Sequence, residues 1–259
     1  MKVDTVYRGR LGNNLFQYAF SRIIAEDLGY SLNPYKGEFE SAFVNCKEPL
    51  VSTKTESNNQ HEFLTDGNFD FESVLNNKTT RTILCDGYFQ KHSFYDNYRC
   101  KIKKWFELAP LSDFTVSEKD IILHIRRSDF ILSDSVLPFN WYDKILQDGS
   151  WGKIYITGGC NQMNTQMDID SSVISHFAQY NPIYINSDSL TTFKIIQEFT
   201  NIVQSQSTFC WWAAYLSERA EKIFTPIPSR GNWCGKNPDI DLIINHCSRY
   251  INLKQNIDF

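Results

Sequence analysis

Long apolar stretches are missing from this chain of 259 residues. A helix that spans a membrane needs about 20 consecutive apolar residues, and no run in the sequence approaches that length. The first residues also lack the apolar core of a secretory signal, because Asp4 stands among them. We therefore expect no integral membrane segment and a cytoplasmic location.

Paired cysteines are missing as well. The seven cysteines are odd in number and widely scattered, and none of them forms a Cys-x-x-Cys pair. This pattern argues against a disulfide framework and against a zinc site, and it is typical of a reducing compartment. The five histidines show no metal-ligand spacing either.

The chain has no excess of basic residues. Its formal net charge is −4 and its pI is about 5.8. Proteins that bind nucleic acid usually carry a basic patch or stripe, so we expect no nucleic-acid partner. The hydrophobic content of 42% describes a well-packed globular protein, and the length allows one large domain or two of ordinary size.

Short apolar runs alternate with amphipathic stretches along the chain. In the N-terminal part, a strand over 3–7 precedes a turn at 9–13 and a helix over 14–28. A polar, poorly periodic segment over 33–80 separates this unit from a strand at 82–85 and a helix at 97–108. The best candidate for a linker is 109–119, which carries proline, serine and aspartate.

After this linker the alternation becomes regular. The predicted strands are 121–125, 153–157, 182–186, 201–205 and 222–226, and the predicted helices lie near 140–147, 161–168, 189–199 and 209–220. Such alternation indicates an α/β fold with parallel strands and right-handed crossovers. We predict two α/β domains, residues 1–110 and 118–259, with a cleft between them.

Two adjacent arginines follow the apolar run Ile121–Leu123 in the hexapeptide His-Ile-Arg-Arg-Ser-Asp. Ligands of open α/β sheets bind at the carboxyl ends of the strands, and guanidinium groups suit phosphate there. Arg126 and Arg127 are therefore candidates for binding an anion. The alternative is a surface pair that forms ion bridges with acidic residues.

Two further segments place polar groups at predicted helix starts. The turn Gly9–Asn13 joins a strand to a helix, where free N–H groups and the helix dipole favour an anion. Ser207 and Thr208 begin the second such helix, just ahead of Trp211 and Trp212. The alternatives are a turn that uses glycines for geometry, and an ordinary helix cap followed by tryptophans packed in the core.

Acidic pairs of the form Asp-x-Asp occur at 168–170 and 239–241. Some sugar transferases hold a divalent ion with such a pair. Both copies lie in polar segments and neither ends a clear strand. We interpret both as solvated surface pairs and expect no metal site.

Three stretches together resemble the α-1,2-fucosyltransferase family. Gly9–Phe20 resembles the opening G-G-L-G-N-Q-M-F-Q-Y-A-F, His124–Asp129 resembles H-I-R-R-G-D, and Ser207–Leu216 resembles S-T-F-S-W-W-A-A-x-L. Shorter similar blocks lie at 87–90 and 137–142, and order and spacing agree from about residue 3 to 235.

This resemblance implies a GT-B-like fold of two Rossmann-type domains and an inverting, metal-independent glycosyltransferase. The donor would be GDP-fucose, the acceptor a glycan, and no cofactor would be needed. The first domain would face the acceptor and the second would bind the nucleotide sugar.

The resemblance also implies roles for individual residues. Arg126 would grip the β-phosphate of the donor, with Arg127 in support and His124 on the same strand. The remaining donor-site residues would be Gly12, Asn13, Ser207, Thr208 and Phe209. His124 has the alternative of being a packed, hydrogen-bonded residue.

Two carboxylates are candidates for the catalytic machinery. Asp134 matches a position at which related α-1,6-fucosyltransferases carry a carboxylate that is proposed as the general base. Its alternative is an acidic residue of an exposed loop. Asp129 continues the arginine motif, where it would brace the guanidinium groups or the loop.

The sequence also departs from the family pattern. Ser128 replaces a glycine, and Thr157-Gly158-Gly159-Cys160 stands where the family often has Ser-Asp-Asp. Thr192 occupies the place of an aspartate that resembles a guanine-reading residue, with Asp188 four residues away. Two alternatives stay open: a related transferase with another donor sugar or base, and a non-catalytic module that binds sugar nucleotides or glycans.

Overall fold

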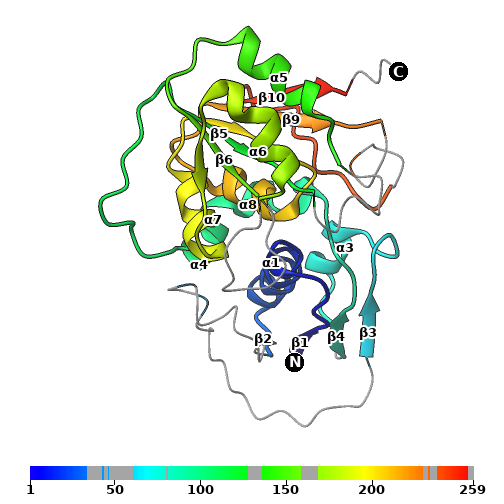
Figure 1. Ribbon diagram of the computed structural model, residues 1–259. Coiled ribbons are helices and arrows are strands. Elements are labelled where there is room, and N and C mark those ends of the chain that lie inside the picture. The colour runs from blue at the N-terminus through cyan, green and yellow to red at the C-terminus, as the bar shows by residue number, and fades with distance from the viewer. Residues whose placement is uncertain are drawn as a thin grey trace. The chain divides into compact units, whose positions relative to one another are not determined.

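The computed structural model describes residues 1–33, 43, 46, 61–79, 81–127, 136–158, 169–229, 233 and 238–255. The chain divides into two compact units (Figure 1). Unit 1 comprises Met1–Ala109 and Pro238–Asp241, and unit 2 comprises Pro110–Asn237 and Leu242–Phe259. Pro238–Asp241 joins unit 1 through the backbone of Asp241, whose N–H donates to Gln90 and whose carbonyl accepts from His92, both at 2.8 Å.

Unit 1 contains a parallel sheet of four strands in the order β2-β1-β4-β3. Its strands are β1 (Lys2–Thr5), β2 (Ser31–Leu32), β3 (His61–Leu64) and β4 (Thr82–Cys85). Its helices are α1 (Leu11–Leu28), α3 (Phe71–Asn76) and α4 (Arg99–Trp105), with 3₁₀ turns η1 (His92–Phe94) and η2 (Asp96–Tyr98). The chain order reverses between β1 and β4, so the carboxyl ends of these two strands lie side by side.

Helix α1 is buried along almost its whole length, which makes it the centre of the unit 1 core. Gly29 ends it in the left-handed conformation with a φ of 70°, and its N–H donates to carbonyls of the last turn. The helix begins at Leu11, three residues earlier than predicted. Gly12 and Asn13 therefore lie in the first helical turn, which corrects their predicted place in the preceding loop.

Unit 2 contains a parallel sheet of six strands in the order β10-β9-β8-β5-β6-β7. The strands are β5 (Ile121–His124), β6 (Ile154–Thr157), β7 (Ile183–Ile185), β8 (Asn201–Val203), β9 (Lys222–Ile227) and β10 (Tyr250–Lys254). The helices are α5 (Phe139–Asp148), α6 (Ser171–Phe177), α7 (Ser189–Gln197) and α8 (Thr208–Leu216), with a 3₁₀ turn η4 at Ala178–Tyr180.

The strand order of unit 2 is that of a doubly wound Rossmann-type sheet, 3-2-1-4-5-6 in the numbering of the unit itself. From β5 the chain moves outward through β6 and β7, and it then returns to the other side of β5 as β8. Ligands of such sheets bind at this reversal, beyond the carboxyl ends of the two central strands. The prediction of an α/β fold with parallel sheets is confirmed.

The structure differs from the sequence prediction in several elements. No element was predicted in the polar segment 33–80, yet it contains β3 and α3, and neither β2 nor β10 was predicted. The helix predicted near 161–168 lies outside the described residues, and the described helix of this region is α6. These missed strands lie at or beside the sheet edges, where burial is low and the hydrophobic signal is weak.

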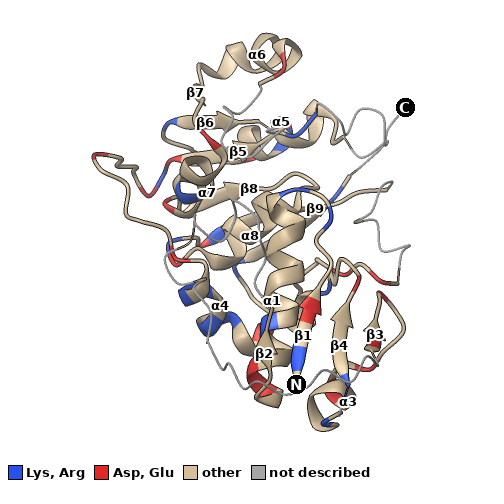
Figure 2. Ribbon diagram, turned by 90° about the horizontal axis from the view of Figure 1, so that it is seen from below, with Lys and Arg blue, Asp and Glu red and all other residues tan. Residues whose placement is uncertain are grey.

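Charged residues decorate both units (Figure 2). The blue residues gathered on α4 are Arg99, Lys101, Lys103 and Lys104. No helix among the described residues combines the length and the apolar character that a membrane crossing requires.

Candidate anion-binding site

The site in unit 2 starts from β5, whose residues Ile121–Leu123 are fully buried. A central parallel strand is covered on both faces, so its chain reaches solvent only beyond its ends. Arg126 and Arg127 follow the carboxyl end of β5, and both side chains are half-buried there. The two arginines therefore lie at the end of a strand, where the sequence analysis predicts them.

The neighbouring strand β8 contributes the turn Gln204–Ser207, which is buried throughout. Ser207 is the N-cap of α8, but its side chain makes no capping hydrogen bond. Its hydroxyl instead accepts from the Nη1 of Arg126 at 3.4 Å, which is a long hydrogen bond. The arginine end of β5 and the N-terminus of α8 therefore meet at the reversal point of the sheet.

The first backbone N–H groups of α8 have no partner inside the helix, as at any helix start. These groups and the helix dipole give the position a partial positive charge. With Arg126 beside it, the site has the features of an anion-binding site: two kinds of fixed donor and no carboxylate in the described contacts of Ser207.

His124, the last residue of β5, links this strand to the turn that follows β8. Its Nδ1 lies 2.7 Å from the hydroxyl of Ser205, and its ring is 1% exposed. Burial, assisted by the positive charge of Arg126, lowers the pKa of His124 to about 3. The imidazole is therefore neutral near pH 7. The structure shows it as a packed, hydrogen-bonded residue, which is the alternative that the sequence left open.

Arg127 takes a different direction from Arg126. Its guanidinium carbon lies 4.7 Å from the ring centroid of Phe139 at the start of α5, and its Nε lies 3.8 Å from the carboxylate of Asp170. Asp170 is the N-cap of α6, and its side chain accepts from the N–H of Ser172 at 2.7 Å. Asp170 is thus a partly exposed residue that also caps a helix; Asp168 lies outside the described residues.

The other members of the α8 motif are mostly core residues. Phe209 is buried and packs between His124 and Phe193, with ring centroids 5.8 and 5.5 Å away. Trp211 and Trp212 are fully buried, so packing explains both tryptophans. Thr208 keeps partial exposure at the helix start. Asp129 and Asp134 lie outside the described residues, so their predicted roles stay predictions.

Asp188, the aspartate nearest to Thr192 in the sequence, has a structural role. Asp188 caps α7, accepting from the N–H groups of Leu190 and Thr191 and from the Thr191 hydroxyl at 2.6–3.0 Å. Thr192 is fully buried, with its hydroxyl 2.9 Å from that of Ser187. Neither residue offers a carboxylate edge for a base.

In unit 1, Gly12 and Asn13 form part of the carboxyl edge between β1 and β4. The Oδ1 of Asn13 accepts from the Nε2 of Gln90 at 3.1 Å, which connects the start of α1 to the chain after β4. Gly9 must be glycine, because its φ is 80° and an added Cβ would lie 2.3 Å from the Nδ2 of Asn13. The absence of a side chain at Gly9 therefore lets the side chain of Asn13 lie close to the backbone of this turn.

A buried glutamine in unit 1 escaped the sequence analysis. Gln17 is fully buried, and its Oε1 accepts from the Arg8 N–H and from Asn14, both at 3.1 Å. Its Nε2 donates to the carbonyl of Gly87 at 3.1 Å. The signals in the sequence were a polar residue within a predicted amphipathic helix and its match to a glutamine of the family motif.

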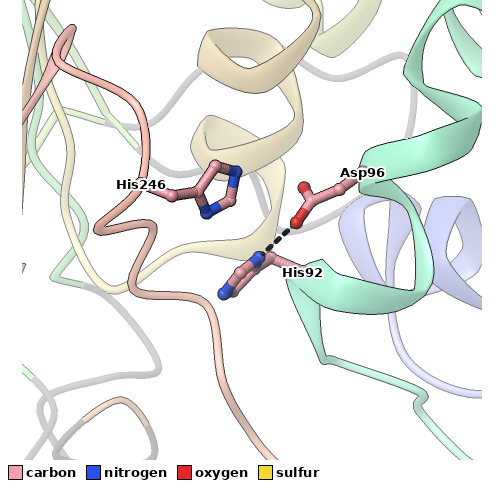
Figure 3. Close-up of side chains that lie close together, drawn as sticks. All are labelled: His92, Asp96 and His246. Carbon is pink, nitrogen blue, oxygen red and sulfur yellow. Dashed lines mark hydrogen bonds and ion pairs between the residues drawn. The ribbon is translucent and has the colours of Figure 1, made fainter.

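The second acidic pair belongs to unit 1, where it lies close to a histidine. The Nδ1 of His92 bonds to the carboxylate of Asp96 at 2.8 Å (Figure 3). Its Nε2 lies 3.9 Å from the carboxylate of Asp241. Burial lowers the pKa of His92, but the hydrogen bond and the charge of Asp96, together with Asp241, outweigh it and raise the pKa overall. His246, which is also labelled in Figure 3, belongs to unit 2.

Neither a protein-family model nor a curated protein sequence matches the chain. Among solved structures, the chain is similar to POFUT1 in complex with GDP, with 10% identity, a TM-score of 0.46, and coverage of 99% of this chain and 98% of that chain. It is also similar to an apo form of POFUT1, with 11% identity, a TM-score of 0.39, and coverage of 84% and 94%. These values are too low to carry an argument, and the family interpretation rests on the three sequence motifs.

Proposed function

We propose that the protein is an inverting glycosyltransferase that transfers L-fucose from GDP-fucose to a hydroxyl group of a glycan. The observation that carries this proposal is the meeting of Arg126 with Ser207 and the N-terminus of α8 at the reversal point of the unit 2 sheet. The motif resemblance names the donor. In this proposal unit 2 binds the nucleotide sugar and unit 1 the acceptor, as two domains of a GT-B-like fold.

The chemistry explains why such a site suits this reaction. As the glycosidic bond breaks, the departing nucleoside diphosphate gains negative charge. Cations and N–H groups that are already in place bind this developing charge more tightly than they bind the intact donor, which lowers the barrier. Arg126, supported by Arg127, supplies the charge that a divalent metal supplies in other transferases.

Inversion requires the acceptor hydroxyl to attack from the side opposite the diphosphate. A general base takes the proton of that hydroxyl as the new bond to the sugar carbon forms and the bond to the diphosphate breaks. In this proposal Asp134 is the base, and Asp129 braces the arginines.

One observation favours a second candidate, a related transferase whose donor carries another base. The carboxylate that reads guanine in the family pattern is absent at Thr192, and Asp188 is occupied as a helix cap. The phosphate half of the site is therefore better supported than the nucleoside half.

The test measures binding and turnover together. Calorimetry and melting curves with GDP, UDP, dTDP and GDP-fucose should show tightest binding for GDP and GDP-fucose, and GDP release should rise when a suitable glycan is added. Arg126→Ala should lower turnover by about two to three decades, the loss found when one transition-state donor is removed. The matched control is Arg219→Ala, which removes an exposed arginine paired with Glu198 and should leave turnover unchanged.

Each other result has a definite meaning. No stabilisation by GDP rejects GDP-fucose as the donor, and a preference for UDP or dTDP selects the second candidate. Binding of a sugar nucleotide without turnover or donor hydrolysis across many acceptors selects a non-catalytic module. Near-normal turnover of Arg126→Ala rejects the assignment of Arg126 to the binding of the donor phosphate.

A further inference from the structure

Two described contacts position the guanidinium of Arg127. The ion pair with Asp170 is 3.8 Å long, which is beyond hydrogen-bonding distance, and the Nε makes no hydrogen bond to any residue that the structure describes. A second described contact is with the ring of Phe139, 4.7 Å from the guanidinium carbon. A cation lying over an aromatic ring is held by the ring electrons, and its in-plane N–H donors stay available for an anion.

The ring of Phe139 also contacts two residues of α6. His176 stacks on it with centroids 4.5 Å apart and an interplanar angle of 28°, and Phe177 packs edge-on at 5.4 Å. These two residues come from α6, whereas Phe139 is the first residue of α5. The aromatic contact therefore ties the positions of two helices to one arginine.

A carboxylate fixes the stacked histidine. One oxygen of Asp143 lies 2.8 Å from the Nε2 of His176, and the other accepts from the Tyr180 hydroxyl at 3.0 Å. Both oxygens are thus occupied, and Asp143 itself is largely buried, with 16% of its side chain exposed. The ring of His176 is held in one orientation, and so is the ring of Phe139 against it.

Phe139 packs against the edge of the unit 2 core and keeps partial exposure. The buried face of α5 consists of Trp141, Tyr142, Ile145 and Leu146, whereas Phe139 is only partly buried. Besides its core contacts, this ring has His176 at 4.5 Å and the guanidinium carbon of Arg127 at 4.7 Å from its centroid. Any apolar residue would cover the same core, but only an aromatic ring would orient a guanidinium.

We infer that Phe139, braced by His176 and Asp143, is a positioning residue that aims Arg127 at the diphosphate of the donor. This inference rests on the proposed function, because it assigns Arg127 to the same anion. It adds a specificity for an aromatic side chain at position 139 that neither the arginine motif nor the α8 motif contains.

The experiment is a double-mutant cycle that combines Phe139→Leu with Arg127→Ala, with calorimetric titration of GDP and of inorganic pyrophosphate. Phe139→Leu should weaken the binding of both probes about fivefold, in the range measured for cation–π contacts. It should have no further effect in the Arg127→Ala protein, because the residue that it positions is gone. Phe139→Tyr keeps the ring and should bind within about twofold of the wild type.

The matched control is Tyr184→Leu, which removes another partly buried ring packed against the same core but without a described contact to Arg127. It should leave the affinity unchanged. If Phe139→Leu does not fold, His176→Ala takes its place in the same cycle, because it removes the brace and leaves the ring. Melting temperatures of all variants show whether a loss of affinity comes from a loss of folding or from a misplaced Arg127.

Two failures are distinguishable. If the wild type binds neither GDP nor pyrophosphate, the proposed function fails and the inference fails with it. If the wild type binds but Phe139→Leu leaves the affinity unchanged, only the positioning role is rejected. The same holds if Phe139→Leu lowers the affinity equally with and without Arg127.

Discussion

At the carboxyl end of β5, a neutral histidine lies beside two permanent cations. A charged imidazole there would face the guanidinium of Arg126 in a buried setting, so burial and repulsion both favour the neutral form. The neutral ring can then share a hydrogen with Ser205 and hold the turn that leads into α8. His124 thus has a structural role in holding this turn.

This arrangement predicts how stability responds to acid. The pKa of His124 is about 3 in the folded protein, below the ordinary value of 6.5, so below that ordinary value the unfolded chain takes up a proton that the folded protein refuses. The contribution to stability is complete above about pH 6.5 and is lost progressively as the pH falls toward 3, with a total on the order of a few kcal/mol.

We therefore expect His124→Gln to flatten the decline in the free energy of unfolding between pH 7 and pH 4, measured by urea denaturation at several pH values. The control is His61→Gln, at an exposed position in unit 1, which should keep the wild-type slope. A His124→Gln curve parallel to that of the wild type would contradict the assignment.

The sequence was informative about residues whose partners are local. A buried strand followed by two arginines is a continuous pattern, and its position at the sheet end followed directly from it. The partners of Arg127 were beyond reach for a physical reason: Phe139 and Asp170 are 12 and 43 positions away in the sequence, and only the packing of α5 and α6 brings them to the arginine.

At the scale of elements, α1 shows how packing overrides local preference. Glycine and asparagine disfavour helix interiors, which is why the predicted helix begins after Asn13. The observed helix includes both residues, and the N–H of Asn13 already donates to the carbonyl of Arg10 at 2.9 Å. Leu11 and Gly12 are buried, so tertiary contacts offset the weak propensity of this first turn.

Gln17 is the strongest link between α1 and the two strand ends beside it. Replacing it by leucine would keep the volume roughly constant but leave the Arg8 N–H and the Gly87 carbonyl without their partner. A buried polar group that loses its partner costs about 1–3 kcal/mol, so we expect Gln17→Leu to lower the free energy of unfolding by about 2–4 kcal/mol.

Guanidinium denaturation measures this loss, with the slope expected to stay constant. Gln179→Leu is the control, because this exposed glutamine of η4 donates one hydrogen bond, to the backbone carbonyl of His176 in α6. It should change stability by no more than about 0.5 kcal/mol, as surface substitutions usually do. A loss for Gln17→Leu as small as that of the control would show that the three hydrogen bonds are not needed.

At the scale of the whole molecule, chain order and spatial order differ at one place. Residues 238–241 follow five strands of unit 2, yet they pair with unit 1 through Lys91 and Asp241. The sequence contained no sign of this return, since a short polar segment pairs with whatever backbone is near it. Domain limits deduced only from the alternation of strands and helices assign residues 238–241 to the domain that surrounds them in the sequence.

The distribution of charge over the two units leads to a prediction about metals. In the proposed reaction, the charge on the leaving diphosphate is met by Arg126, Arg127 and the N-terminus of α8. Of the two acidic pairs, Asp170 is engaged as a helix cap and with Arg127, and Asp241 shares its surroundings with His92 in unit 1. The described carboxylates of these pairs therefore already have partners within the protein.

Turnover should therefore persist in excess EDTA, within about twofold of the untreated rate, because preorganised cations already perform the electrostatic task of a metal. GDP release from the donor, followed with and without EDTA and after the addition of magnesium or manganese, measures this directly. The double variant Asp239→Asn/Asp241→Asn should retain the same rate and the same indifference to EDTA. If EDTA abolishes turnover and manganese restores it, the arginines do not suffice, and the loss or survival of that rescue in the double variant decides whether this acidic pair holds the metal.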